Sequence, residues 1–258
     1  MDMRAMRNKH DDSTPLAPPP ALDPRRHALF LDLDGSLLEI EQHPQDVRAS
    51  AALRELLQQI SAAMSGAVAL ITGRTVDDAD RILHGALGHI AGVHGSEVLH
   101  GGQVTRAKAQ SGELDAARED VRRLLAQDGV RALVEDKGAS LALHYRQTPE
   151  AEAPIKRIAA EIAAARGLRL LEGKMVVELV AGARTKGDAL AGFMAQPPFA
   201  GRAPVAVGDD RTDEDAFAAC NRLGGWGVLV GAPRESAASF ALADPAAVGA
   251  WLERSLPR

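Results

Sequence analysis

Apolar residues are spaced along the chain in two ways, as short continuous runs and as positions three or four residues apart. The first continuous run covers 27–33 and carries Asp32 near its end, with Asp34 directly after it. Further runs of strand length lie at 67–71, 89–94, 204–207 and 226–230. Helical spacing covers 49–64, 75–83, 186–194, 212–220 and 246–252. Because fully apolar strands that alternate with helices are typical of a parallel sheet covered on both faces, these segments predict a doubly wound α/β core.

The middle of the chain has a different order of predicted elements. Helical spacing covers 114–125 and 149–166, and each of these helices is followed by two strand-like segments. The predicted strands lie near 131–135, 139–146, 168–171 and 175–180. Short glycine-containing turns join the strands of each pair, which indicates an antiparallel sheet. We therefore predict an inserted αββαββ domain of the α+β class at 105–182, between the core segments 25–104 and 183–258.

Residues 1–24 are predicted to form a flexible tail outside the fold. Their prolines are Pro15, Pro18, Pro19, Pro20 and Pro24. A proline-rich stretch with little apolar periodicity favours extended polyproline structure. No apolar stretch ending in a small-residue cleavage site follows the positive residues, so a secretory signal is not expected.

Composition excludes several classes of function. The net charge of −5 argues against a general nucleic-acid-binding protein, which usually carries a basic face. No apolar run approaches the roughly 20 residues that a membrane-spanning helix needs. Cys220 is the only cysteine, which excludes an internal disulfide and a cysteine metal site and favours a reducing, cytoplasmic location.

Reactive side chains follow three predicted parallel strands at their carboxyl ends, where sheets of this kind bind ligands. They are Asp32 and Asp34, then Thr72, Gly73 and Arg74, and then Asp209 and Asp210, with Lys186 at the start of a helix. Neighbouring carboxylates repel each other unless a cation compensates them, and Mg²⁺ prefers oxygen ligands. We therefore predict Mg²⁺ bound by the side chains of Asp32 and Asp209, with the backbone carbonyl of Asp34 as a third ligand.

The same residue types are suited to phosphoryl transfer. One carboxylate can attack phosphorus while the other holds a proton, and Thr72 and Lys186 can bind the phosphoryl oxygens. Each motif taken alone is also compatible with an ordinary polar turn. Only their combination, each at a predicted strand end or helix start, indicates a phosphatase centre.

Four segments resemble the motifs of the haloacid dehalogenase (HAD) superfamily of phosphatases. They are "DLDGSL" at 32–37, "TGR" at 72–74, "TKG" at 185–187 and "GDDRTDEDAF" at 208–217. With "GVHGSE" at 92–97 and "SLALHYR" at 140–146, the chain resembles the trehalose-6-phosphate phosphatase family from about residue 27 to its end. The resemblance implies a Rossmann-like HAD core with an inserted cap domain of the C2 type. This chain departs from the family pattern at two positions, where members more often have Thr at 36 and Ser at 72. Both residues present here, Ser36 and Thr72, keep a hydroxyl group.

The resemblance also implies roles for the individual residues. Asp32 is expected to be the nucleophile that forms an aspartyl phosphate, and Asp34 the general acid and base. Asp32, the Asp34 carbonyl and Asp209 are expected to bind Mg²⁺, with Asp210 and Asp213 supporting these ligands. Phosphate or substrate binding is expected of Gly35, Ser36, Thr72, Gly73, Arg74 and Lys186.

The inserted sheet is predicted to have one apolar and one polar face. By strand alternation, Leu141, Leu143 and Tyr145 share one face, and Ser140, His144 and Arg146 share the other. From the pattern alone, the polar face is equally compatible with a solvated surface and with a surface that binds sugar hydroxyls. The resemblance favours the second interpretation, with substrate contacts from Glu135, Lys137, Arg146, Glu172, Lys174 and Glu178. Among the histidines, His94 is expected to have a structural or substrate-orienting role, whereas His84, His89 and His100 are expected to be solvated.

Our leading hypothesis is a Mg²⁺-dependent phosphatase that hydrolyses trehalose 6-phosphate to trehalose and phosphate. A phosphatase of sucrose 6-phosphate or of a hexose phosphate is the alternative within the same class. A sugar phosphomutase would need a second phosphate-binding loop, which we do not identify in the insert, and a non-catalytic sensor would not need the acidic pair. The expected partners are the sugar phosphate and a separate trehalose-6-phosphate synthase, with no nucleic acid and no membrane. The chain itself is expected to act as a monomer or dimer.

Overall fold

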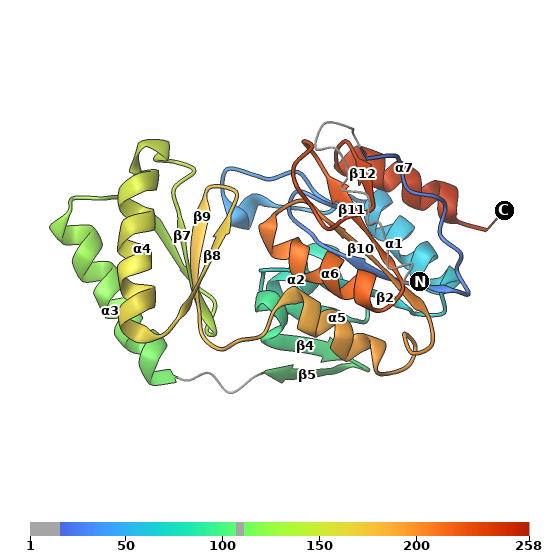
Figure 1. Cartoon of the computed structure of the whole chain (residues 1–258), viewed down its shortest axis with the longest axis horizontal. Coiled ribbons are helices and arrows are strands. Elements are labelled where there is room, and N and C mark those ends of the chain that lie inside the picture. Colours follow the sequence, from blue (N-terminus) through green and yellow to red (C-terminus); the bar gives the residue numbers. More distant parts are fainter. Residues whose placement is uncertain (1–15, 107–110, 258) are drawn as a thin grey trace, which may run out of the picture.

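The larger of two β-sheets is mostly parallel and forms the core. The computed structural model describes residues 16–106 and 111–257 (Figure 1). In spatial order, the strands of this sheet are β12 (Phe240–Leu242), β11 (Trp226–Val230), β10 (Ala203–Gly208), β1 (His27–Leu31), β2 (Val68–Ile71), β3 (Ile90–Gly92), β4 (Glu97–His100) and β5 (Gln103–Arg106). Neighbours from β12 to β3 pair in parallel, and β4 and β5 add an antiparallel hairpin at the edge. The predicted doubly wound core is confirmed.

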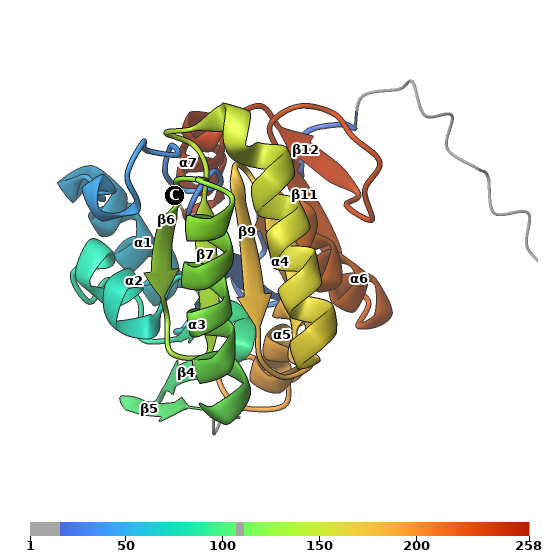
Figure 2. The same ribbon diagram turned by 90° about the vertical axis from the view of Figure 1, so that its left-hand side faces the viewer.

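Helices cover both faces of the core sheet. They are α1 (Ala51–Ala63), α2 (Val76–Leu83), α5 (Lys186–Met194), α6 (Glu214–Arg222) and α7 (Pro245–Ser255). Helix α1 packs against α7, and α5 packs against α6. Figure 2 shows α1 and α2 on one side of the molecule and α6 on the other. Within the ranges that the structure describes, no helix combines the length and the apolar composition that crossing a membrane requires.

The second sheet is antiparallel and has four strands. Its spatial order is β6 (Leu133–Asp136), β7 (Ser140–His144), β9 (Val176–Val180) and β8 (Arg169–Gly173). Two helices, α3 (Ser111–Gln127) and α4 (Glu152–Arg166), cover one face of this sheet, as Figures 1 and 2 show. Leu141, Leu143, Val177 and Leu179 pack with these helices in an apolar cluster separate from that of the core. The predicted αββαββ order is therefore confirmed, and the polar face of the sheet is left toward the core.

Short 3-10 helices complete the regular structure. They are η1 (Pro44–Asp46), η2 (Val93–Gly95), η3 (Pro149–Ala151) and η4 (Arg211–Asp213). Two of them lie beside the strand ends that carry the predicted chemistry. η2 follows β3 and contains His94, whereas η4 follows β10 and contains Asp213.

The prediction of a tail outside the fold is wrong for residues 16–24. Leu22 is buried in the core, and its N–H donates to Ser255 Oγ at 3.1 Å. Trp251 Nε1 donates to the Pro20 carbonyl at 2.8 Å. An extended proline-rich segment makes no internal hydrogen bonds, so its carbonyls are free to accept such bonds from the core. The rest of the predicted tail, residues 1–15, lies outside the described residues.

Candidate active site

A cleft separates the carboxyl ends of the core strands from the polar face of the second sheet. The predicted site residues that line it are Asp32, Asp34, Thr72, Gly73, Arg74, His94, Glu135, Lys137, Arg146, Lys174, Glu178, Lys186, Asp209 and Asp210. On one side they follow the ends of β1, β2 and β10 or lie in η2 and α5, and on the other they lie in β6, in β9 and in the turns and strand ends of the second sheet. The tertiary structure thus brings together residues that are up to 178 positions apart (Asp32 to Asp210).

A buried lysine joins two carboxylates at the floor of the cleft. Asp32 leaves the end of β1, and its backbone N–H donates to the Val207 carbonyl of β10 at 2.9 Å. Lys186, the first residue of α5, donates through Nζ to Asp32 Oδ1 at 2.8 Å and to Asp213 Oδ1 at 2.7 Å. Burial raises the pKa of Asp32 well above its usual value, and nearby Asp213 and Asp209 add to this, while Lys186 opposes it. Burial likewise raises the pKa of Asp213 to about 6.

The third carboxylate of this cluster is Asp209. One oxygen each of Asp32, Asp209 and Asp213 lie within 4.8 Å of one another. Asp213 also accepts from the backbone N–H groups of Asp209 and Asp210, at 3.0 and 3.1 Å, and so shapes the turn that carries Asp209. The three carboxylates could together hold a cation, and among them Asp32 and Asp209 line the cleft.

A glycine is required beside Asp209. Gly35 has a φ of 87°, a conformation that side-chain-bearing residues rarely adopt. A Cβ atom at this position would lie 2.1 Å from Asp209 Oδ2. Gly35 therefore acts through shape, because it lets the turn after β1 pass close to Asp209.

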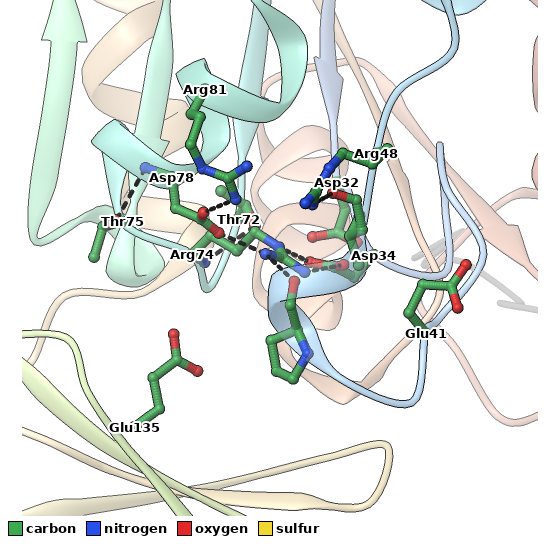
Figure 3. Close-up of polar contacts among 12 residues, drawn as sticks. Asp32, Asp34, Glu41, Arg48, Thr72, Arg74, Thr75, Asp78, Arg81 and Glu135 are labelled. Carbon is green, nitrogen blue, oxygen red and sulfur yellow. Dashed lines mark hydrogen bonds and ion pairs between the residues drawn. The ribbon is translucent and has the colours of Figure 1, made fainter.

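The second aspartate of the β1 turn is held by an arginine. Arg74 Nε donates to Asp34 Oδ2 at 2.6 Å, and its NH2 group donates to Asp34 Oδ1 at 2.8 Å (Figure 3). The backbone N–H of Arg74 donates to Thr72 Oγ1 at 3.2 Å, which shapes the turn after β2. Asp32 and Asp34 thus occupy different environments, one against a buried ammonium and the other against a guanidinium.

Glu178 of the second sheet contacts three polar side chains. It lies on β9, buried at 6% exposure, and its carboxylate accepts from Ser140 Oγ and from Lys137 Nζ at 3.3 Å. Its other oxygen lies 3.0 Å from His94 Nε2 of the core. Burial raises the pKa of Glu178, but the charge of Lys137 and the bonds from His94 and Ser140 outweigh that effect and lower it overall. Glu178 is therefore ionised and links the second sheet to the core.

Two further contacts cross the cleft. Lys174, in the β8–β9 turn, forms an ion pair with Asp209, so an ammonium group lies against the buried acidic cluster. Arg146 donates to the Glu41 carbonyl of the core and, through NH2, to the Lys174 carbonyl at 2.9 Å. Glu135 accepts from His144 Nε2 at 2.9 Å on the polar face of the second sheet. These polar groups surround the space that faces Asp32.

Some predicted residues lie elsewhere. Ser36 is completely buried and does not line the cleft, so its predicted contact with phosphate has no support from its position. Glu172, predicted to face the substrate, points to the helix-covered side and pairs with Lys156 Nζ of α4 at 3.0 Å. It lies opposite Val177 in the β8–β9 ladder, and Val177 belongs to the apolar cluster. Strand alternation therefore assigns Glu172 to the wrong side for substrate.

The prediction of solvated histidines is wrong for His89 and His100. Their ring centroids lie 4.7 Å apart. Both rings pack against Phe193 and Phe199, and their Nδ1 atoms are buried without a hydrogen-bond partner. Burial lowers the pKa of His89. Proximity to turns in the sequence therefore misled the prediction, because the aromatic partners come from α5 and the segment after it.

The loop after β1 supplies cleft residues that the sequence analysis missed. They are Ile40, Glu41, Pro44 and Val47. Val47 is buried at 2% exposure, and the Pro44 carbonyl accepts from Arg74 NH1 at 3.0 Å. The loop has neither apolar periodicity nor a motif, so its only signal is its position directly after the "DLDGSL" segment. Leu171, Gly173 and Val176 line the cleft as well. Leu171 and Gly173 lie two residues apart on β8, as do Val176 and Glu178 on β9, and this spacing could have placed them on the polar face.

Comparison with known proteins shows the family of this chain. The family model described as trehalose-phosphatase matches residues 30–246. The chain belongs to the trehalose-phosphatase family. It is 39% identical over 245 residues to the trehalose-6-phosphate phosphatase of Escherichia coli K12, covering 93% of this chain and 90% of that protein. A probable trehalose-phosphate phosphatase of Sinorhizobium fredii is 40% identical over 209 residues, which are 80% of this chain and 78% of that protein.

Solved structures share the fold of this family member. A trehalose-6-phosphate phosphatase related protein matches with a TM-score of 0.70 at 26% identity, covering 88% of this chain and 95% of that one. The C-terminal domain of the Candida albicans trehalose-6-phosphate phosphatase matches with a TM-score of 0.79 at 19% identity, covering 92% and 98%. A haloacid dehalogenase-like hydrolase of Bacteroides thetaiotaomicron matches with a TM-score of 0.62 at 16% identity, covering 89% and 99%. The predicted Rossmann-like HAD core with an inserted α+β unit agrees with these likenesses.

Proposed function

We propose that the protein hydrolyses trehalose 6-phosphate to trehalose and phosphate through an aspartyl phosphate on Asp32. The observation that carries this proposal is the position of Asp32, on the cleft floor against Lys186 and opposite a polar sheet face, in a chain of the trehalose-phosphatase family. The Escherichia coli relative bears the name of this activity and covers nearly the same length of chain.

Mg²⁺ is the cofactor that we propose for this reaction. Carboxylate oxygens of Asp32 and Asp209 lie close together and buried, and hard divalent cations prefer such ligands. Lys174 pairs with Asp209 from the cleft side, and Mg²⁺ would take the place of this ammonium group on the carboxylate. When bound, Mg²⁺ would neutralise the charge of the acidic cluster and of the phosphate. The backbone carbonyl of Asp34 remains the proposed third ligand from the protein.

The chain's own residues perform the proton and phosphoryl transfers. An Asp32 carboxylate oxygen forms a bond to phosphorus as the bond from phosphorus to the sugar oxygen breaks, and Asp34 gives its proton to that oxygen. In the second step Asp34 accepts a proton from water, the water oxygen bonds to phosphorus, and phosphate leaves Asp32. Lys186 stabilises the charge on Asp32 and on the transferring group, because its ammonium is buried and fixed by two carboxylates.

We propose that residues 105–182 act as the cap over the core formed by 25–104 and 183–258. The polar residues on its sheet, Glu135, Lys137, Arg146, Lys174 and Glu178, would bind sugar hydroxyls. Because a site built to hydrogen-bond hydroxyls rejects substrates that lack them, such a surface would select the disaccharide. The contact of Glu178 with His94 would also keep water out while Asp32 is phosphorylated.

A panel of sugar phosphates tests the proposal. Purified protein with Mg²⁺ should release phosphate from trehalose 6-phosphate with a higher kcat/KM than from sucrose 6-phosphate or glucose 6-phosphate. A higher value for another sugar phosphate would assign the chain to a different phosphatase activity, and transfer to a second sugar without phosphate release would assign it to the phosphomutases. The predicted synthase partner, location and state of association stay predictions.

A further inference from the structure

Most N–H groups of the Arg74 guanidinium are hydrogen-bonded to other groups of the protein. Two of its nitrogens donate to the two oxygens of Asp34, and NH1 donates to the Pro44 carbonyl at 3.0 Å and to Asp78 Oδ2 at 2.5 Å. An arginine side chain carries few N–H groups beyond these, and Arg74 is only 8% exposed. Little donor capacity is therefore left for a substrate phosphate, which is the contact that the sequence predicts for Arg74.

Asp78 fixes the side of Arg74 that faces away from Asp34. It lies in the first turn of α2, where its backbone N–H donates to Thr75 Oγ1 at 3.2 Å, and its second oxygen accepts from Arg81 (Figure 3). Burial raises the pKa of Asp78, but its bonds with Arg81 and Arg74 outweigh this and lower it overall. Asp78 is therefore ionised at neutral pH, and it lies on a helix outside the lining of the cleft.

We infer that Asp78 and Arg74 are positioning residues that orient Asp34 for proton transfer, an inference that rests on the proposed function. A planar guanidinium that bonds both oxygens prevents the carboxylate from rotating. Asp78 holds Arg74 in the plane that this pairing needs.

The chain offers a matched control for Asp78. Asp77 lies in the same helical turn and carries the same charge, but its side chain is 78% exposed and pairs with Arg106 instead of Arg74. Asp77→Asn therefore makes the same chemical change one residue away, with no route to Asp34. Arg74→Lys is the second variant, because lysine keeps the charge and cannot bond both oxygens in one plane.

The experiment compares wild type, Asp78→Asn, Asp77→Asn and Arg74→Lys on trehalose 6-phosphate and on 4-nitrophenyl phosphate. Misplacing a proton donor lowers kcat without weakening substrate binding, so we expect Asp78→Asn to lower kcat on the sugar phosphate about tenfold with KM within about twofold of wild type. Arg74→Lys should lose more, and Asp77→Asn should match wild type. The loss on 4-nitrophenyl phosphate should be much smaller, because its leaving group needs little protonation.

Three results would overturn the inference. Wild-type kcat in Asp78→Asn or in Arg74→Lys would show that Asp34 needs no support from the substituted residue. A raised KM at unchanged kcat would make Arg74 a substrate-binding residue, and equal losses on the two substrates would mean that the pair only supports the fold. If the wild-type protein releases phosphate from no sugar phosphate, both the proposed function and the inference are rejected. If the wild type is active and Asp78→Asn is unaffected, only the inference is rejected.

Discussion

Lys186→Met should destabilise the protein strongly in the absence of Mg²⁺, and more at neutral than at acidic pH. The ammonium of Lys186 is 3% exposed and bonds Asp32 and Asp213, which lie close to Asp209. Methionine has a similar length and no charge, so the substitution leaves these buried carboxylates without their internal cation. Removing one partner of a buried ion pair costs about 3–5 kcal/mol in the free energy of unfolding, and we expect this loss near pH 7.5.

The pH dependence follows from the raised pKa values. The folded state holds the pKa of Asp213 at about 6 and that of Asp32 above its usual value, so their charged forms destabilise the fold at high pH. Protonation relieves this destabilisation as the pH falls through about 6. At pH 5 Asp213 is largely neutral and Asp32 is protonated to a greater extent than at pH 7.5, so less compensation is needed and the cost of Lys186→Met should fall to about 1–2 kcal/mol.

Urea denaturation followed by circular dichroism, with EDTA present, measures both values. Lys156→Met is the matched control, because Lys156 pairs with Glu152 and Glu172 at the surface and should change the unfolding midpoint little. An unfolding free energy of Lys186→Met equal to that of wild type at pH 7.5 would refute the reasoning. If Lys186→Met loses the same unfolding free energy at pH 5 as at pH 7.5, protonation of the carboxylates does not determine that loss.

The remaining predictions concern catalysis and the cation. Asp32→Asn should abolish phosphate release while trehalose 6-phosphate still binds in calorimetry, because the amide cannot attack phosphorus; measurable turnover would remove Asp32 from the nucleophile role. Gly35→Ala should lower both the unfolding midpoint and the Mg²⁺-dependent rate, because its Cβ would collide with Asp209 Oδ2 at 2.1 Å, and wild-type values for both would contradict the close approach. Mg²⁺ should raise the thermal unfolding midpoint more at pH 7.5 than at pH 5, because protons on Asp213, with its pKa of about 6, and on Asp32 compete with the cation. An equal rise at both pH values would argue against binding at this cluster.

Local periodicity was sufficient to predict most of the secondary structure. The predicted helix at 186–194 and the predicted strand at 226–230 have the observed bounds of α5 and β11. The alternation in β7 assigned Leu141 and Leu143 to the helix-covered face, where the structure has them. These features depend on the spacing of neighbouring side chains, which the sequence contains directly.

Features that depend on distant partners could not be predicted in this way. Residues 16–24 have no periodicity of their own, and Leu22 is buried because α7, more than 200 positions later, supplies Ser255 and Trp251. The three-residue strand β12 was missed because only its pairing with β11 defines it. His89 and His100 became an aromatic pair because Phe193 and Phe199 pack against them.

The sequence by itself determined which chemistry the protein carries, since the acidic pair, Lys186 and Asp209 stand in motifs at strand ends and helix starts. Only the tertiary structure decided how that chemistry is arranged. It pairs Lys186 with Asp213 as well as Asp32, and it turns Arg74 toward Asp34 and Asp78. The physical reason is that hydrogen bonds and ion pairs act over about 3 Å, and chain spacing does not specify distances of that size between separate elements.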